Sequence, residues 1–388
     1  MNSLKSQRGG IVFSLLIVVF LIGAASFVYG VNSENNRPDF ALFTVSFLFL
    51  LGISQAGVVF TAMLRLVEAD WGKPYYRIAE LSTLAFFPFA IVGFLLIIYF
   101  SKNELFYWLQ AAPEDHISPW LNLNWLLVRN FGGLLLFYGL TAIYVIKGLR
   151  PDMASSAAAT TIDHAEVEKQ LYLFSPIIII SFIVCNTFIA WDFAMMLIPH
   201  WHSTVFPIHY WFGNVFAGFA AMIAIAVIMR RVDGGAHFGT YQIKSLGMVV
   251  TGFTLLWLYF FWAQFFVIWF GNLPQESEPI WRQMYGHYSP YFWTMLAGCF
   301  FIPFVTLLFA IIKRSALAMC LVAFSINLGI WLNKYLMILP VFSPDHRPFG
   351  HWIDIALAIG LLAGFLATII MLARRLPVYS AWEMSRES

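Results

Sequence analysis

The sequence predicts an all-α integral membrane protein, and three observations lead to this prediction. Of the 388 residues, 61% are hydrophobic, and only 11% carry a charge. No soluble domain of this size is expected to have that balance. The apolar residues also gather in runs of about 20, the length that a helix needs to cross the hydrocarbon core of a bilayer. Most of the chain is therefore expected to lie in lipid.

Ten apolar runs follow one another, and each is predicted to be a transmembrane helix. The first follows Lys5 and Arg8 and is too long for the apolar part of a typical cleaved signal peptide, so it is expected to be retained. The polar linker 150–169 is expected to lie on the surface, and no second domain is expected within 1–388. The predicted spans are residues 10–31, 39–66, 77–100, 122–149, 170–192, 204–230, 243–270, 288–312, 315–338 and 350–374.

The distribution of Lys and Arg predicts the orientation of these spans. Loops on one side of the predicted topology hold sixteen of these residues, and loops on the other side hold six. The side rich in positive charge is expected to face the cytoplasm. Both termini are therefore predicted to be cytoplasmic. The other, outer loops are rich in Trp, Pro, Asn and His, which suits either an interface anchor or a docking surface for another protein.

Spans 2–5 and spans 6–9 are equal in number, and both sets begin on the outer side. This permits two four-helix bundles related by an internal repeat. The bundles are predicted at 38–200 and 201–340, flanked by the helices 10–31 and 350–374.

One short segment of the chain gathers ionisable side chains at the predicted outer boundary. Asp192, His202 and His209 follow one another there, beside Trp191 and Trp201. An ionisable group in hydrocarbon is costly, so such a cluster is expected either to reach water or to have a function. A nearby carboxylate also helps an imidazole to hold a proton. We therefore expect these acid and imidazole groups to act together.

A second group of polar residues lies near the predicted inner ends of the spans. Glu80 comes one turn after Arg77, so the two can pair on one helix face, and a carboxylate at the centre of a span costs up to about 3 kcal/mol. The predicted proton path consists of Arg77, Glu80, Asp70 and Glu68, together with Lys334 and Asp354, which lie near the predicted outer ends.

Several members of this path also have a simpler interpretation. Arg65, Glu68, Asp70 and Lys73, at or just beyond the inner ends of the second and third spans, suit charges at the level of the lipid headgroups. Lys334 can extend outward to water, and Asp354 suits an outer interface residue. The sequence leaves both interpretations open.

The motifs of other functional classes are missing from the sequence. Three cysteines, Cys185, Cys299 and Cys320, are far apart and have no haem-attachment or iron–sulfur spacing. The nine histidines lie in predicted loops or near span ends, whereas a transmembrane haem usually needs facing pairs within spans. No nucleotide-binding loop or basic patch with interleaved aromatic residues occurs. No haem, iron–sulfur cluster, metal site or nucleic-acid partner is therefore expected, and the chain is not expected to be catalytic alone.

These residue types suit the oxidation of a quinol, a flat apolar ring with two hydroxyl groups. Such a reaction needs an aromatic-walled pocket, hydrogen-bond partners and a titratable group that leads to water. The predicted catalytic residues are Asp192, His202 and His209. The predicted quinone-binding residues are Gln55, Arg129, Trp191, Trp201 and Ser203.

Three stretches of the sequence resemble the NrfD/polysulfide reductase membrane-subunit family, with a likeness to the C-type and F-type quinone-binding subunits of bacterial alternative complex III. They are GISQAGVVFTAMLRLVEADWGKPYYRIAELSTLAF (52–86), FIAWDFAMMLIPHWHSTVFPIHYWFGNVFAG (188–218) and FFWAQFFVIWFGNLPQE (260–276). The resemblance implies a ten-helix subunit of a quinol:cytochrome c oxidoreductase in the bacterial inner membrane. It also implies a bound quinone such as menaquinone near the outer face, and proton conduction through the bundles.

The resemblance further implies partners: an outer iron–sulfur or molybdopterin-like subunit, c-type haem subunits, and a homologous NrfD-like membrane subunit. Gln55 stands where the C-type relatives commonly have a histidine, and glutamine cannot accept a proton near neutral pH. The sequence leaves open whether this chain is similar to the C-type or the F-type relatives. Two alternatives also stay open: a proton-conducting or anchoring subunit without quinol chemistry, and a secondary transporter.

Overall fold

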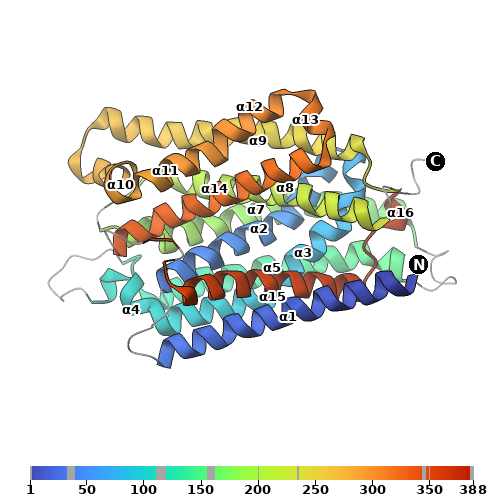
Figure 1. Cartoon of the computed structure of the whole chain (residues 1–388), viewed down its shortest axis with the longest axis horizontal. Helices are drawn as coiled ribbons and strands as arrows, with labels where there is room; N and C mark the ends of the chain where they lie inside the picture. The colour runs from blue at the N-terminus through green and yellow to red at the C-terminus, as the bar shows by residue number, and fades with distance from the viewer. Residues whose placement is uncertain are drawn as a thin grey trace.

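The computed structural model describes residues 2–32, 40–110, 119–154, 162–199, 201–233, 236–342, 347–348 and 350–384. All regular elements within these ranges are helical (Figure 1). Ten helices there are long and apolar enough to cross a membrane, which confirms the predicted fold class. The middle of the predicted linker, residues 155–161, lies outside the described residues.

Nine of the spans are centred on single long helices. These are α1 (Asn2–Asn32), α2 (Phe40–Leu66), α3 (Lys73–Leu96), α5 (Leu123–Met153), α7 (His164–Phe193), α8 (Phe206–Asp233), α9 (Thr240–Gly271), α14 (Ala316–Phe342) and α15 (Trp352–Arg375). The eighth span is formed by α11 (Ser289–Leu296), the π-helical η6 (Ala297–Phe301) and α12 (Ile302–Leu308).

Short helices extend or connect the spans. They are η1 (Asp70–Gly72), the π-helical η2 (Ile97–Ser101), α4 (Lys102–Leu105), η3 (Tyr107–Leu109), η4 (Met195–Leu197), α10 (Pro274–Met284), η5 (Gly286–Tyr288), α13 (Ala310–Arg314) and α16 (Ala381–Met384). The sequence predicted a loop where α10 lies. Proline in the first turn of α10 suits a helix start, because its missing N–H has no helical partner there.

Side-chain caps fix the start of two spans. The Asn122 side chain accepts hydrogen bonds from the backbone N–H groups of Asn124 and Trp125 at the start of α5. Asp163 caps α7 in the same way, accepting from Ala165 and Glu166. Such caps satisfy backbone donors that have no partner inside the helix. Both caps lie where the sequence changes from polar loop to apolar span.

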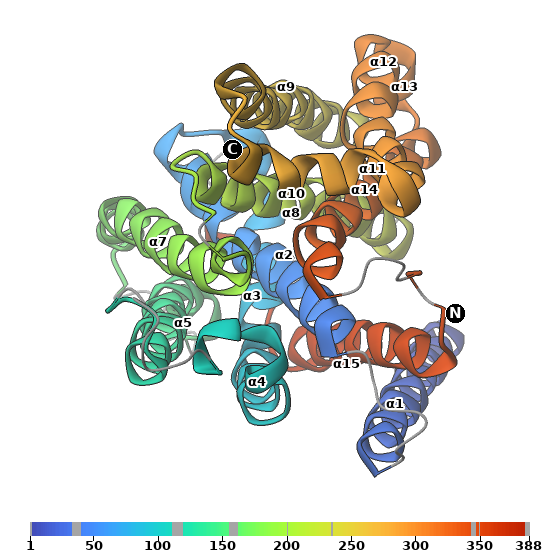
Figure 2. The same cartoon turned by 90° about the vertical axis from the view of Figure 1, so that its left-hand side faces the viewer.

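Helix α2 runs through the middle of the molecule (Figure 2). It contacts α3, α7, α8, α14 and α15. Small residues permit the close approach of α2 and α8: a Cβ atom on Gly218 would come within 2.3 Å of the Ala56 Cβ. In lipid, where apolar burial drives helix association little, such close packing is a main source of helix–helix affinity.

The remaining long helices pack around α2 or against its neighbours. Helices α3, α5 and α7 contact one another or α2, and α8 contacts α9 and α14, while α1 packs along α15 (Figures 1 and 2). This contact pattern is compatible with the predicted bundles, whose relation by a repeat stays a prediction.

The long helices share a common direction, so the molecule has two distinct ends (Figure 1). The start of α1 and helix α16 lie at one end, here called the terminal end (Figure 1). Helix α10 lies at the opposite end, here called the α10 end. By the distribution of Lys and Arg, the terminal end is predicted to be cytoplasmic and the α10 end to be the outer one.

Candidate functional site

A narrow cavity of about 40 Å³ lies at the α10 end and is here called the His209 cavity. Its walls come from the connection of α7 to α8 and from helices α8, α9, α10, α11 and α14. The lining residues are Ala194, Ile198, Trp201, Phe206, His209, Phe261, Gln264, Phe265, Pro279, Ile280, Gln283, Phe292, Asn333 and Met337. Aromatic walls with a few polar groups are typical of small-molecule sites.

Two side chains in this cavity, the buried His209 and the half-buried Gln264, have buried polar atoms without a hydrogen bond to any described residue. Both ring nitrogens of His209 lack a hydrogen-bond partner in the described structure, and so does the Oε1 atom of Gln264. His209 is only 3% exposed, and its ring lies 5.5 Å from that of Trp257. A buried polar group without a partner costs about 1–3 kcal/mol. The cavity therefore suits a ligand, or ordered water, that hydrogen-bonds to these atoms.

Asp192 has a different setting, at the end of α7. The Arg129 Nε atom donates to its Oδ2 atom over 2.6 Å, and a second guanidinium nitrogen donates to Oδ1. The amide of Asn130 also donates to Oδ2. The Arg129 guanidinium in turn lies 4.3 Å from the ring centre of Trp120, which Trp191 contacts edge-on. Asp192 thus accepts three hydrogen bonds and joins α7 to α5.

The predicted cluster of Asp192, His202 and His209 is not assembled. The side chain of His202 is 81% exposed, and its Nδ1 atom lies 3.8 Å from a carboxylate oxygen of Glu276. The cause is local: α7 ends at Phe193, and the chain then takes an irregular course that puts His202 on the surface. This corrects the expectation of one shared site.

The neighbours of His202 lie closer to the cavity. Trp201 lines it, and the indole Nε1 of Trp201 donates to the backbone oxygen of Glu276 over 3.2 Å. The backbone N–H of Ser203 contacts the sulfur of Met195 at 3.4 Å. Of the residues predicted for the quinol site, His209 and Trp201 therefore share the cavity, and Ser203 packs beside the connection that forms its wall.

Gln55 belongs to a buried chain of amides at the meeting of three spans. Its Oε1 atom accepts a 2.8 Å hydrogen bond from Asn186 of α7. Asn186 in turn accepts one of 2.8 Å from Asn214 of α8. The side-chain carbonyl of Gln55 therefore already accepts a hydrogen bond from the protein, whereas that of Gln264 does not within the described residues. The amide chain joins α2, α7 and α8.

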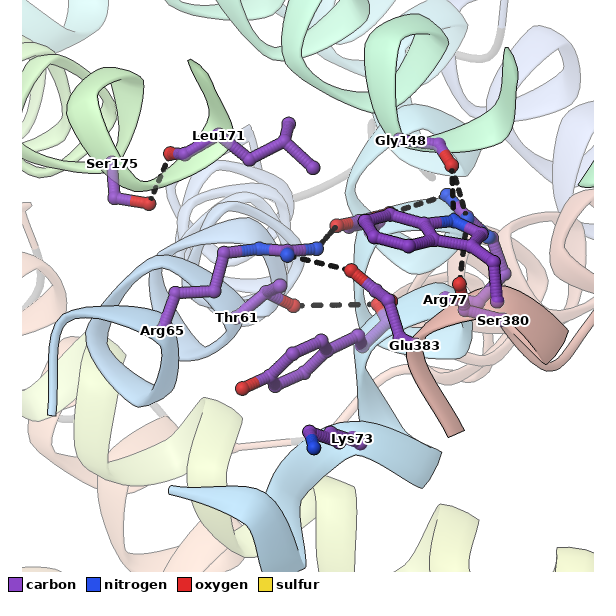
Figure 3. A network of polar contacts seen from close by, with 12 residues as sticks. Thr61, Arg65, Lys73, Arg77, Gly148, Leu171, Ser175, Ser380 and Glu383 are labelled. Carbon is purple, nitrogen blue, oxygen red and sulfur yellow. Dashed lines mark hydrogen bonds and ion pairs between the residues drawn. The ribbon is translucent and has the colours of Figure 1, made fainter. Parts of the chain in front are cut away.

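A buried ion network lies towards the terminal end (Figure 3). One terminal nitrogen of the Arg65 guanidinium lies 2.6 Å from a Glu383 carboxylate oxygen, and the other lies 3.6 Å from one of Glu80. Arg77 lies 2.9 Å from Glu80 and 2.9 Å from Asp152. All five side chains are less than a tenth exposed. The sequence predicted that Arg77 and Glu80 can pair, and the structure also shows Arg65 buried within the protein, paired with Glu383 and Glu80.

The C-terminal segment completes this network. Ser380 donates to Asp152 over 3.2 Å, and the backbone N–H of Ala381 donates to the other oxygen of Asp152 over 3.0 Å. The indole of Trp382 donates to the backbone oxygen of Gly148. The guanidinium of Arg77 donates to the same oxygen (Figure 3). These contacts could not be predicted from the sequence, because their partners lie far apart along the chain.

A wide pocket of about 470 Å³, here called the inner pocket, reaches the network from the terminal end. Arg65 and Glu383 of the network line it. So do the predicted path residues Glu68 and Asp70, and Asp70 pairs with Lys73 at 2.7 Å. The remaining lining residues are Tyr76, Ala165, Glu168, Lys169, Tyr172 and Trp382. The pocket gives water a way to the buried ions.

Lys334 and Asp354 lie apart from this network. Lys334 is fully buried in α14, and its ammonium group donates to the backbone oxygen of Tyr210 over 3.3 Å and lies over the tyrosine ring. Lys334 therefore does not extend outward to water. Asp354 is 6% exposed in the first turn of α15, the helix that packs on α1. The predicted path residues thus fall into three separate places.

Comparison with known proteins identifies the family. The family model described as "Polysulphide reductase, NrfD" matches residues 30–343, which is most of the chain. No curated protein sequence matches the chain. Ten candidate spans lie in the described residues, and none of their His, Cys, Asp and Glu side chains form a group of three or more able to hold a metal ion. The chain belongs to the NrfD polysulphide reductase family of multi-pass membrane proteins.

Proposed function

We propose that this chain is the quinol-binding membrane subunit of an electron-transfer complex, and that the quinol ring binds in the His209 cavity. The observation that carries the proposal is the pair of unpaired polar groups on His209 and Gln264, buried among aromatic side chains. A hydroxyl group of a quinol can hydrogen-bond to these groups. The complex resembles alternative complex III of the bacterial inner membrane, and menaquinol is a suitable substrate.

The residues of the His209 cavity have different roles in the proposed oxidation of quinol. Oxidation of a quinol to a quinone releases two electrons and two protons. The neutral imidazole of His209 can take the proton of one hydroxyl, pass it on to the rim, and so become free to take the second. The amides of Gln264 and Asn333 can hydrogen-bond to the ring oxygens and orient them but accept no proton. The electrons leave to an iron–sulfur subunit docked at the α10 end and then to c-type haem subunits. A second NrfD-like subunit forms the rest of the membrane part.

The surface pair His202 and Glu276 gives released protons a place beside the cavity. Trp201 lines the cavity and is bonded to the backbone of Glu276, and His202 follows Trp201 in the sequence and is exposed. In this proposal, protons pass from His209 to this rim and then to outer water. Asp192 acts differently, because its hydrogen bonds to Arg129 and Asn130 suit a positioning residue better than a proton acceptor.

A second proposed function, proton conduction, rests on the ion network. In the described structure, this network holds the carboxylates of Glu80, Asp152 and Glu383 but only the guanidinium groups of Arg65 and Arg77. An excess of buried negative charge is costly, and taking up a proton removes the excess. The inner pocket would supply that proton, and Glu80 would pass it towards the middle of the membrane.

The test compares histidine variants in the complex purified with its partners. His209→Leu is expected to remove bound quinone and to abolish quinol oxidation. His351→Leu is the matched control, since His351 is exposed at the start of α15, and it is expected to keep both. If His209→Leu retains its quinone and its turnover, the proposed site is refuted.

A further inference from the structure

The His209 cavity is too small, as it stands, for the ring that the proposed function places in it. A cavity that holds benzene has a volume of about 150 Å³, whereas this one measures about 40 Å³. A space of that size suits a few water molecules. One wall must therefore move before a ring can enter.

Most walls of the cavity belong to spans held on several sides. Helices α8, α9 and α14 contact one another along the bundle. Helix α10 is different: it has only eleven residues, and it is not one of the ten spans. One face of α10 covers the cavity with Pro279, Ile280 and Gln283. Its other face carries an exposed pair, Glu278 and Arg282, 2.7 Å apart.

The backbone at both ends of α10 favours movement as a unit. In the described chain, three residues have a positive φ, and two of them flank this helix: Asn272 at 46° and Gly286 at 69°. Asn272 terminates α9, so no helical hydrogen bonds continue across it into α10. A Cβ atom on Gly286 would meet nothing within 4 Å. Rotation at Asn272 therefore breaks no hydrogen bond between α9 and α10, and rotation at Gly286 disturbs only the single hydrogen bond that its backbone oxygen accepts in η5.

Few polar contacts hold α10 against the cavity. Its backbone accepts one hydrogen bond from Trp201, and Glu276 lies 3.8 Å from the exposed His202. A surface contact of this kind, which is an ion pair only when His202 is protonated, contributes about 0–1 kcal/mol. The Trp281 ring adds an edge contact with Phe265, with ring centres 6.2 Å apart. The closed position is therefore one that a modest free energy can open.

We propose that α10 is a lid that swings out about Asn272 and Gly286 to admit a quinol ring, and then closes on it. The proposal rests on the proposed function for the identity of the ligand. Opening exposes His209 and Gln264, and closing shields the proton transfer from bulk water. His202 and Glu276 form the latch between the lid and the body of the protein.

The test fixes the latch reversibly in the complex purified with its partners. In the double variant His202→Cys and Glu276→Cys, a short bis-maleimide with a cleavable disulfide tethers α10 to the body. The control variant, Glu278→Cys with Arg282→Cys, takes the same reagent within α10 alone. Two rates are measured: modification of His209 by diethylpyrocarbonate, read by mass spectrometry, and binding of dimethylnaphthoquinone and duroquinone.

We expect the tether to slow both rates by about tenfold or more, with recovery after cleavage and no change in the control. An unchanged rate of His209 modification in the tethered protein overturns the lid proposal, whether or not the binding of the quinones changes. If the tether slows that modification but the untethered protein binds neither quinone, the lid stands and the proposed function fails.

Discussion

The side-chain amide of Asn186 in α7 donates a 2.8 Å hydrogen bond to the Oε1 atom of Gln55 in α2. Together with Asn214, which donates to Asn186, these residues join both predicted bundles within the membrane. Side-chain hydrogen bonds between spans contribute about 0.6–2 kcal/mol each. The space for this chain depends on Gly52, whose missing side chain leaves room for the amide of Asn214.

Replacement of that glycine tests the packing of the amide chain. A Cβ atom at position 52 would come 2.4 Å from the Cγ atom of Asn214. We expect Gly52→Ala to lower the free energy of unfolding by about 1–3 kcal/mol, measured by thermal unfolding in detergent. In the control Gly132→Ala, the new Cβ meets nothing within 4 Å, and stability is expected to stay the same or rise by up to about 1 kcal/mol. An equal change in the free energy of unfolding in Gly52→Ala and Gly132→Ala would contradict this account of the packing.

The Asp192 carboxylate is predicted to stabilise the protein through Arg129. Asp192→Asn leaves a buried guanidinium without its charged partner, which costs about 3–5 kcal/mol. The matched control is Asp163→Asn on the same helix, where asparagine caps a helix as well as aspartate does. A large drop in melting temperature is expected for the first variant and almost none for the second. Similar melting temperatures would show that the Arg129 pair contributes little.

Glu383 is predicted to stabilise the terminal end. Glu383→Gln removes a charge 2.6 Å from Arg65, and loss of a charge-assisted hydrogen bond is expected to lower stability by about 1.5–3 kcal/mol. Glu104→Gln, at an exposed position near the α10 end, serves as the control. Limited proteolysis should cut the C-terminal segment faster in Glu383→Gln than in the control. No difference in cutting would argue against this role for Glu383.

Proton conduction is tested separately from electron transfer. Glu80→Gln in the assembled complex is expected to reduce proton uptake into vesicles at least about tenfold while quinol oxidation continues, because the substituted amide cannot carry a proton. Vesicle pH dyes and quinol absorbance give the two rates. Glu104→Gln again is the control. Proton uptake that persists in Glu80→Gln would remove the network from the path.

Gln264 is predicted to contribute to quinol affinity. Gln264→Leu removes one hydrogen-bonding group, worth about 0.5–1.5 kcal/mol. The KM for quinol is therefore expected to rise by about two- to tenfold. Gln275→Leu, on the exposed side of α10, is the control and should leave KM unchanged. A KM in Gln264→Leu equal to that of the control would place the ring elsewhere.

The sequence predicted the ten spans because long apolar runs determine them almost alone. The predicted second span, 39–66, differs from α2 by one residue. Helix α10 was missed because eleven residues with charges and two prolines give no apolar run, although Pro274 marks its start. Such short helices depend on the surface that they cover, which a single sequence does not show.

The site was predicted in part, for a similar reason. His209 and Trp201 stood out as rare polar and aromatic residues at a span end, and both line the cavity. Gln264 was overlooked, although a lone amide inside the aromatic run FFWAQFF is a usable signal. The partner of Asp192 proved to be Arg129, 63 positions earlier. Side chains on different helices pair according to which helix faces meet in the fold. Nearness in sequence instead suggested His202 and His209 as the partners of Asp192.

The contact of Glu383 with Arg65 also has a consequence for biosynthesis. Arg65 enters the bilayer with the second span, whereas its closest carboxylate follows the tenth. Until the ribosome has made that segment, the guanidinium must remain at the hydrated surface or rely on Glu80 alone. The terminal end of the nascent protein is therefore open during translation, and docking of α16 is a late step in its maturation.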